Sequence, residues 1–162
     1  MATRLLKPSV VVETGCATGW VSALFLLALH HNHHGHLYSI DLPPVAGTLS
    51  MDWTMPDGLE AGFLVPPQLR DRWTFIRGDV RVELIPLLEK LGHVDLFFHD
   101  SDHTYVHMMW EYTSVWPYLS TGGVLVSDDI GWNTAWWDFA TAVGRPIRIH
   151  RSNTNVGALS KS

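Results

Sequence analysis

The sequence has few of the features that mark secreted, membrane-spanning and nucleic-acid-binding proteins. Its single cysteine, Cys16, cannot form an internal disulfide, which favours a reducing, cytoplasmic location. The longest apolar run, residues 20–29, is too short to span a bilayer, and residues 1–15 lack the pattern of a signal peptide. No run of Lys or Arg occurs and the formal net charge is −5, so a nucleic-acid partner is not expected.

The composition is that of one globular domain. With 162 residues, 46% of them hydrophobic and 17% charged, the chain can bury a core of ordinary size. We expect a single domain over residues 1–162, and the composition leaves open whether it forms a homo-oligomer. Five of the ten histidines lie in residues 30–36. A metal site there would need fixed spacing and supporting contacts, so we favour a polar helix end that runs into a turn at Asn32 and Gly35.

An acidic residue stands at or just past the end of each of five apolar segments. These residues are Glu13, Asp41, Asp79, Asp100 and Asp128. Continuous apolar segments are typical of parallel strands that are buried on both faces. In an open α/β sheet the ligand binds beyond the carboxyl ends of the strands, so all five carboxylates are expected at one crevice. Such a crevice attracts hydroxyls, amines or cations and repels phosphate, which favours S-adenosylmethionine over a nucleotide.

Apolar segments alternate with helical patterns along the chain, which predicts a doubly wound, Rossmann-like α/β sheet that is mostly parallel. The expected strands cover residues 9–14, 37–41, 73–77, 94–99, 124–127, 147–151 and 156–160. The last two are expected to pair as an antiparallel hairpin. The expected helices cover residues 20–31, 86–91, 104–118 and 133–143. Residues 43–72 are rich in Pro and Gly and are predicted to form a lid-like insertion.

Two of these helices carry more specific expectations. Pro86 suits the first turn of its helix, where its missing N–H costs nothing. In the helix over residues 104–118, a stripe of side chains at helical spacing is expected to face the core. The stripe consists of Val106, Met109, Trp110, Thr113 and Trp116.

The turn ETGCATG, residues 13–19, is the first chemical signal. Gly15 allows a sharp turn, and Gly19 lets the following helix begin close to a ligand. The turn therefore suits either a backbone cradle for a cofactor or a tight strand-to-helix connection. It is not a complete GxGxxG fingerprint, and Glu13 would sit badly beside a pyrophosphate.

Two further carboxylates can serve the same cofactor. Asp41 ends the second expected strand, where a carboxylate can accept two hydrogen bonds from a ribose diol of NAD or of S-adenosylmethionine. Asp79 can reach an adenine amino group or form a local turn with its own backbone, and the sequence leaves both readings open.

The densest group of acidic residues follows the fourth and fifth expected strands. Asp100, Asp102 and His103 crowd the end of one strand, and Asp128 and Asp129 end its neighbour. Close carboxylates repel one another unless they share a proton or a cation. Oxygen ligands of this kind suit magnesium or calcium. Capping of the next helix accounts for only one of these residues.

An imidazole can accept a proton near neutral pH, so His103 is the first choice for a general base, with Asp100 beside it. His99 is the second choice, and either histidine can equally be structural. Four tryptophans can wall an apolar acceptor pocket or fill the core. They are Trp53, Trp132, Trp136 and Trp137.

Together these segments resemble class I S-adenosylmethionine-dependent methyltransferases, in the branch with an IDGxHxY-like motif after the fourth strand. The similar segments are VVETGCATGWVS, GHLYSIDLP, RGDV, VDLFFHDSDHTY and GGVLVSDDI, which span nearly the whole chain. The resemblance implies a seven-stranded sheet that ends in an antiparallel hairpin. It also implies a cofactor site lined by Glu13, Gly15, Cys16, Ala17, Gly19, Asp41, Asp79, Val80 and Asp100.

Some relatives in this branch, including catechol O-methyltransferase, hold magnesium between two such strand ends. Asp100, Asp128 and Asp129 stand at the matching positions, which implies Mg²⁺ as a second cofactor, although the catechol enzyme has Asn in place of Asp129.

The leading hypothesis is methyl transfer to a hydroxyl of a small molecule or a sugar-containing metabolite. One alternative is an NAD-linked oxidoreductase, which the incomplete glycine fingerprint argues against. The other is a non-catalytic module that binds S-adenosylmethionine or S-adenosylhomocysteine, in which the acidic group would have no chemical purpose.

Overall fold

The computed structural model describes residues 2–42, 58–150 and 155–162, and its helices and strands alternate along the chain. Within these ranges, no helix combines the length and the hydropathy needed to cross a bilayer. The strands are β1 (Val10–Thr14), β2 (His36–Asp41), β3 (Trp73–Arg77), β4 (Val94–His99), β5 (Leu119–Ser127), β6 (Arg148–His150) and β7 (Val156–Ser160). The helices are α1 (Ala2–Leu6), α2 (Trp20–Asn32), α3 (Val80–Leu91), α4 (Tyr105–Val115) and α5 (Ala135–Val143), with 3₁₀ turns η1 (Pro67–Arg72) and η2 (Trp116–Tyr118).

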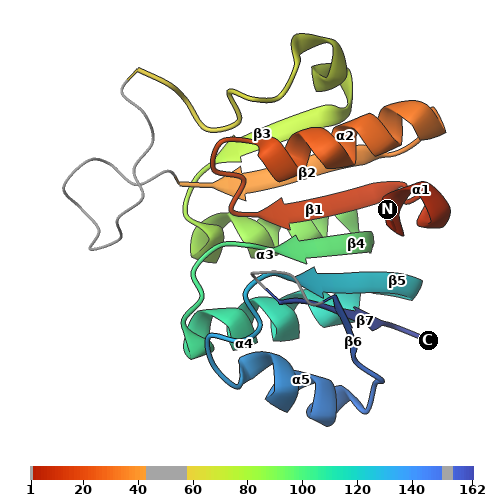
Figure 1. The fold of residues 1–162 in the computed structure, drawn as a ribbon, viewed down its shortest axis with the longest axis vertical. Helices are drawn as coiled ribbons and strands as arrows, with labels where there is room; N and C mark the ends of the chain where they lie inside the picture. The colour runs from red at the N-terminus through yellow and green to blue at the C-terminus, as the bar shows by residue number, and fades with distance from the viewer. Residues whose placement is uncertain (1, 43–57, 151–154) are drawn as a thin grey trace.

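The seven strands form one sheet in the order β3-β2-β1-β4-β5-β7-β6 (Figure 1). The first five strands are parallel, whereas β7 pairs antiparallel with both β5 and β6. The predicted α/β architecture, mostly parallel with a C-terminal antiparallel hairpin, is therefore confirmed. The chain order reverses between β1 and β4, and ligands of open α/β sheets bind at such a reversal, beyond the carboxyl ends of the strands.

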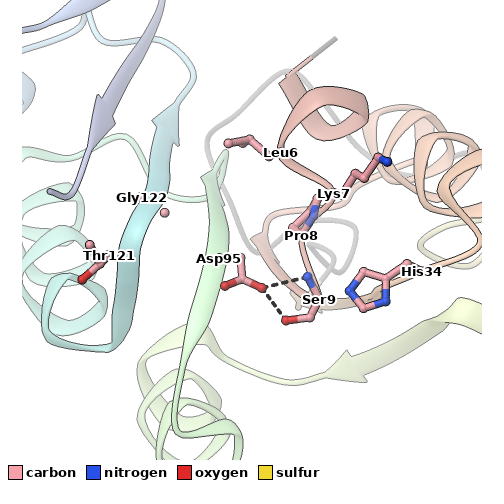
Figure 2. A pocket seen from close by; sticks show the side chains of 9 residues that line it. Leu6, Lys7, Pro8, Ser9, His34, Asp95, Thr121 and Gly122 are labelled. Atoms are coloured by element: carbon pink, nitrogen blue, oxygen red, sulfur yellow. Dashed lines mark hydrogen bonds between the residues drawn. The ribbon is translucent and has the colours of Figure 1, made fainter.

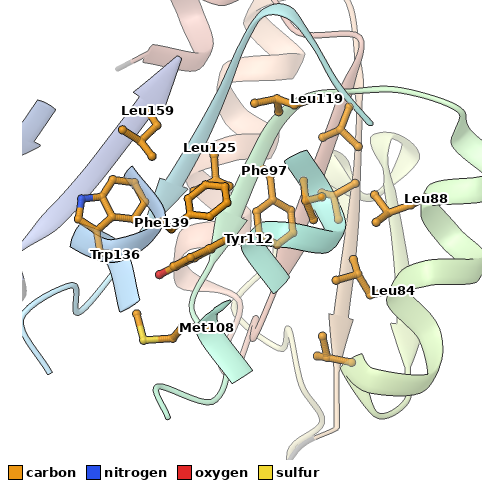
Figure 3. Close-up of a cluster of buried hydrophobic side chains, with 14 of the residues drawn as sticks. Leu84, Leu88, Phe97, Met108, Tyr112, Leu119, Leu125, Trp136, Phe139 and Leu159 are labelled. Carbon is orange, nitrogen blue, oxygen red and sulfur yellow. The ribbon is translucent and has the colours of Figure 1, made fainter. Parts of the chain in front are cut away.

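Helices cover both faces of the sheet, and alternate residues of each strand point to opposite layers (Figure 1). Val12 of β1 and Phe97 of β4 join the larger buried cluster, formed with α3, α4 and α5. Figure 3 shows this cluster around Tyr112. Val11 and Leu96 point the other way and pack in the smaller cluster under α2. Burial on both faces explains why these strands read as continuous apolar segments.

The sequence located several elements to the residue, including β3, β4 and β7, but it misplaced the start of α3. The helix begins at Val80 because Asp79 caps it, its side chain accepting a hydrogen bond from the Arg81 N–H at 2.8 Å. Pro86 was predicted to lie in the first turn of the helix, but it lies inside the helix. The helix lacks one backbone hydrogen bond there as a result. The short helix α1 was not predicted, and β5 begins five residues earlier than expected.

The predicted core-facing stripe of α4 is wrong. Val106 is 67% exposed, and Met109, Trp110 and Trp116 are only partly buried. The buried face lies on the opposite side of the helix from this stripe. It consists of His107, Met108, Glu111, Tyr112 and Val115. An apolar pattern could not reveal this face because two of its members are ionisable.

The second half of the predicted lid packs against the fold. Backbone N–H groups of Gly62 and Leu64 donate to the carbonyls of Ala17 and Thr18, at 2.8 and 2.9 Å. Val65 and Leu69 are buried in the cluster under α2. Residues 62–72 are therefore anchored to the turn after β1 and do not form an open loop. Residues 43–57 of the predicted lid lie outside the described residues.

Candidate active site

The carboxyl ends of four adjacent strands are tied together by backbone hydrogen bonds. The Gly15 N–H donates to Ile40 at the end of β2, the Asp100 N–H to Thr14 at the end of β1, and the Asp128 N–H to His99 at the end of β4. The distances are 2.9, 2.9 and 3.0 Å. These bonds place the residues that follow each strand along one edge of the sheet.

Four of the five carboxylates that the sequence placed at one crevice, Glu13, Asp41, Asp100 and Asp128, influence one another at this edge, and Asp129 joins them in place of Asp79. Burial, followed by the charges of Asp128, Glu13, Asp129 and Asp41 in that order, raises the pKa of Asp100 to about 8. Five carboxylates thus share one electrostatic environment, and it disfavours additional negative charge. The site suits a ligand that brings positive charge or hydrogen-bond donors.

The two glycines of the turn are required by close packing. Gly15 has a φ of 78°, and a Cβ there would lie 2.0 Å from the carbonyl oxygen of Asp100. Gly19 has a φ of 86°, and a Cβ would lie 2.7 Å from the Cα of Gly62. Gly15 therefore lets the turn cross directly over the end of β4. Gly19 makes room for the anchored segment that was expected to form a lid.

Glu13 is fully buried between α2 and β2. Its Oε2 atom accepts hydrogen bonds from the hydroxyls of Ser22 and Ser39, both at 2.6 Å. Its Oε1 atom makes no hydrogen bond with any described residue. Burial raises the pKa of Glu13 to about 7, despite the two hydroxyl donors.

Asp41 lies against the turn after β1. One carboxylate oxygen accepts a hydrogen bond from the Ala17 N–H at 2.6 Å, which links β2 to the turn. Burial raises the pKa of Asp41. Burial, together with the charges of Asp41 and Glu13, also raises the pKa of the Cys16 thiol, so this buried cysteine stays protonated.

Asp79 and Val80 lie at the start of α3. The Asp79 side chain caps the helix, which is one of the two roles that the sequence left open. Val80 is buried in the larger cluster. The cap uses one carboxylate oxygen of Asp79, Oδ1, which accepts the hydrogen bond from the Arg81 N–H.

Asp100, Asp128 and Asp129 lie at the ends of β4 and β5, as predicted. The Oδ1 atom of Asp128 is buried and has no hydrogen-bond partner among the described residues. Asp129 adopts a left-handed backbone conformation with φ of 51°. Across the part of the chain that the structure describes, however, no three His, Cys, Asp or Glu side chains are arranged to hold a metal ion. Magnesium binding stays a prediction.

His103 lies between the acidic residues and an exposed aromatic ring. Its Nε2 atom is 3.9 Å from Asp100 Oδ1, too far for a hydrogen bond. Its ring centroid is 5.1 Å from those of both His99 and Trp132. Burial, together with the neighbouring His99, lowers the pKa of His103 to about 4. The imidazole is therefore neutral at pH 7 and keeps a lone pair.

Three of the four tryptophans lie among the described residues, one of them in the core and two at the surface. Trp136 is fully buried in the larger cluster and fills the core (Figure 3). Trp132 is 59% exposed and lies over His103, where it can contact a ligand. Trp137 is partly exposed on α5. Trp53 lies outside the described residues.

Sequence reasoning missed a buried polar network beneath His103. The carboxylate of Glu111 contacts Thr14, His99, Ser101 and His107, and both Glu111 and His99 are 0% exposed. The spacing of His107 and Glu111, four residues apart on one helix, was the available signal. Their burial could not be read from the sequence.

A cavity of about 230 Å³ lies at the opposite edge of the sheet (Figure 2). Asp95 and Ser9 are in its wall, and Asp95 accepts bonds from the Ser9 N–H, the Ser9 hydroxyl and the Val10 N–H. The Ser120 hydroxyl binds its other oxygen. This carboxylate is fully used in holding the strands together. The carboxyl edge of the sheet, which carries Glu13, Asp41, Asp100, Asp128 and Asp129 and is called the acidic edge below, is therefore the better candidate for a ligand site.

Solved methyltransferases share the fold. The O-methyltransferase from Bacillus cereus in complex with SAH aligns with a TM-score of 0.70 at 11% identity, over 99% of this chain and 77% of that chain. TomG, an O-methyltransferase from Streptomyces achromogenes in complex with SAM, aligns with a TM-score of 0.69 at 15% identity and the same coverage.

The SAH-bound methyltransferase PaMTH1 from Podospora anserina gives a TM-score of 0.69 at 14% identity, over 99% of this chain and 75% of that chain. At such identities the similarity establishes the fold alone. Among curated proteins, none matches the sequence.

A family model described as a methyltransferase domain matches residues 12–130. This range runs from β1 to the turn after β5, and it includes all the residues predicted to bind cofactor or metal. The match covers well over half of the chain. The chain therefore belongs to the methyltransferase-domain family.

Proposed function

We propose that the protein is an S-adenosylmethionine-dependent O-methyltransferase that acts on a hydroxyl of a small molecule or a sugar-containing metabolite. The observation that carries this proposal is the acidic edge at the strand-order reversal of a methyltransferase-family fold. The cofactor bound to the similar structures TomG and PaMTH1, as SAM or SAH, supports the choice of methyl donor.

The residues present fit S-adenosylmethionine, which would supply a methyl group on a positively charged sulfonium. Glu13 offers a buried carboxylate oxygen that has no partner among the described residues, which suits an amino group. Asp41 retains capacity to accept hydrogen bonds from ribose hydroxyls beyond the bond from Ala17. A pyrophosphate, in contrast, would add negative charge to an edge that already disfavours it. This argues against NAD.

The acceptor half of the site is proposed around Asp100, His103 and Trp132. An acceptor hydroxyl must lose its proton as the new C–O bond forms. His103 is neutral at working pH and its Nε2 atom has no partner among the described residues, so it can take that proton. Trp132 presents an exposed ring on which an apolar part of the acceptor can pack.

Magnesium is the alternative to His103 as the group that serves the acceptor hydroxyl, with Asp100, Asp128 and Asp129 as its proposed ligands. The unpartnered Asp128 oxygen and the mutual repulsion of the carboxylates support a cation. The side chains do not form a metal-binding group as they are arranged here. We therefore assign no catalytic step to the metal.

The single buried cysteine supports a cytoplasmic enzyme, and the net charge of −5 supports a small-molecule acceptor and no nucleic-acid partner.

The direct test of activity is incubation with methyl-labelled S-adenosylmethionine and a panel of phenols, sugars and other hydroxylated metabolites. Mass spectrometry then locates the label. We expect it on an acceptor oxygen. A protein that binds the cofactor but transfers no label to any acceptor would be a binding module, and label on nitrogen or carbon would refute O-methylation.

A further inference from the structure

We infer that Glu111 is a positioning residue for Asp100, an inference that rests on the proposed function for its catalytic meaning. Glu111 lies on α4 and is buried. Its carboxylate binds residues that surround Asp100 in the chain and in space.

Each oxygen of Glu111 receives two donors. Oε2 accepts from the Thr14 hydroxyl at 2.7 Å and from His99 Nδ1 at 2.9 Å. Oε1 accepts from the Ser101 hydroxyl at 2.5 Å and from His107 Nε2 at 2.7 Å. One side chain thus joins the ends of β1 and β4, the turn after β4, and α4.

These partners enclose Asp100. His99 and Ser101 are its two neighbours in the chain, and Thr14 accepts the hydrogen bond of the Asp100 N–H through its backbone carbonyl. Glu111 therefore fixes the backbone on both sides of Asp100 and the residue that binds its amide.

The buried carboxylate of Glu111 can fix the backbone around Asp100 because it is ionised. Burial alone would raise the pKa of Glu111, but His99 and His107 lower it well below its usual range. A buried charge that accepts four hydrogen bonds has well-defined geometry, since each lost bond leaves a polar group without a partner. An amide in its place could not accept all four bonds, because its nitrogen is a donor.

The chain offers a matched control at the other end of β4. Asp95 also accepts four hydrogen bonds, from Ser9, Val10 and Ser120, and it lies far from the acidic edge at the amino end of the strand (Figure 2). Glu111→Gln and Asp95→Asn make the same chemical change to similar networks. Both are expected to lower the melting temperature.

Two measurements on the full chain separate positioning from simple stabilisation. In Glu111→Gln, hydrogen exchange of the Asp100 amide should become faster and kcat should fall about 100-fold, as expected for a misplaced catalytic group. Asp95→Asn should leave both near wild type. If Glu111→Gln does not fold, Ser101→Ala removes one of the four bonds and should give a smaller change in the same direction.

The exchange rate does not depend on finding an acceptor. If wild type transfers no methyl group while the Asp100 amide responds to Glu111→Gln but not to Asp95→Asn, the proposed function fails and the positioning of Asp100 stands. If the amide exchanges at the wild-type rate in Glu111→Gln, or if Asp95→Asn has the same effect, the inference is overturned.

Discussion

At the scale of single residues, Asp41 combines a structural contact with a binding role. It holds the turn after β1 through Ala17 and is proposed to accept the ribose hydroxyls. Asp41→Ala should weaken S-adenosylhomocysteine binding by about 1–3 kcal/mol, the cost of leaving polar groups without a partner. Asp41→Asn keeps an acceptor for Ala17 and separates the two contributions. Calorimetry that gives equal affinity for wild type and Asp41→Ala would remove this residue from the site.

His103 and the three aspartates make opposite predictions about catalysis. If His103 is the base, His103→Ala should lower kcat by about 10²–10⁴-fold and excess chelator should leave activity unchanged. If Asp100, Asp128 and Asp129 hold magnesium, chelator should abolish turnover, added magnesium should restore it, and Asp128→Ala should behave like the chelated enzyme. Full activity in chelator would discard the metal and keep the methyltransferase.

Residues at strand ends could be predicted from the sequence, whereas the supporting network could not. An acidic residue after an apolar segment is visible because the segment marks a strand and the strand has a carboxyl end. Glu111 and His107 lie in the core face of a helix, where apolar residues are expected. Their burial depends on hydrogen bonds to Thr14, His99 and Ser101, which come from other elements.

At the scale of elements, the start of α3 tests whether Asp79 caps the helix or binds the cofactor. Asp79→Ala should lower the free energy of unfolding by about 1 kcal/mol through loss of the cap. Asp79→Ser keeps a capping oxygen and removes the charge, so it should restore stability. If Asp79→Ser is stable but binds S-adenosylhomocysteine as weakly as Asp79→Ala does, the carboxylate serves the ligand as well.

The same helix shows where local rules failed. Pro86 was placed in a first turn because proline is favoured there, but the capping interaction of Asp79 begins the helix six residues earlier. The larger cluster, which includes Leu84, Leu87 and Leu88, stabilises the helix despite the missing bond at Pro86. Residues 62–72 were misjudged for a related reason: their Pro and Gly content suggested an open loop, but Val65 and Leu69 are buried under α2.

At the scale of the whole molecule, the acidic edge should make stability depend on pH. The folded pKa values of Glu13 and Asp100, about 7 and about 8, lie above their ordinary values of 4.5 and 3.8. The folded protein therefore binds more protons than the unfolded chain at pH values between the ordinary and the folded pKa values, so stability falls as pH rises towards about 7 for Glu13 and about 8 for Asp100 and levels off above them. The pKa of His103 is lowered from 6.5, so this residue changes the pH dependence of stability only below pH 6.5.

The melting temperature of the ligand-free protein should accordingly fall between pH 6.5 and 8.5. Asp100→Asn, which cannot ionise, should make this decline shallower. A melting temperature that is constant or rises over the same interval would mean that the carboxylates are not crowded as the structure indicates.

The most direct measurement of the central claim is calorimetric titration of the protein with S-adenosylhomocysteine and, separately, with NAD. An acidic edge at the reversal between β1 and β4 predicts saturable binding of S-adenosylhomocysteine, which carries an amino group and no phosphate, and no binding of NAD. Saturable binding of NAD with no heat from S-adenosylhomocysteine would contradict the account.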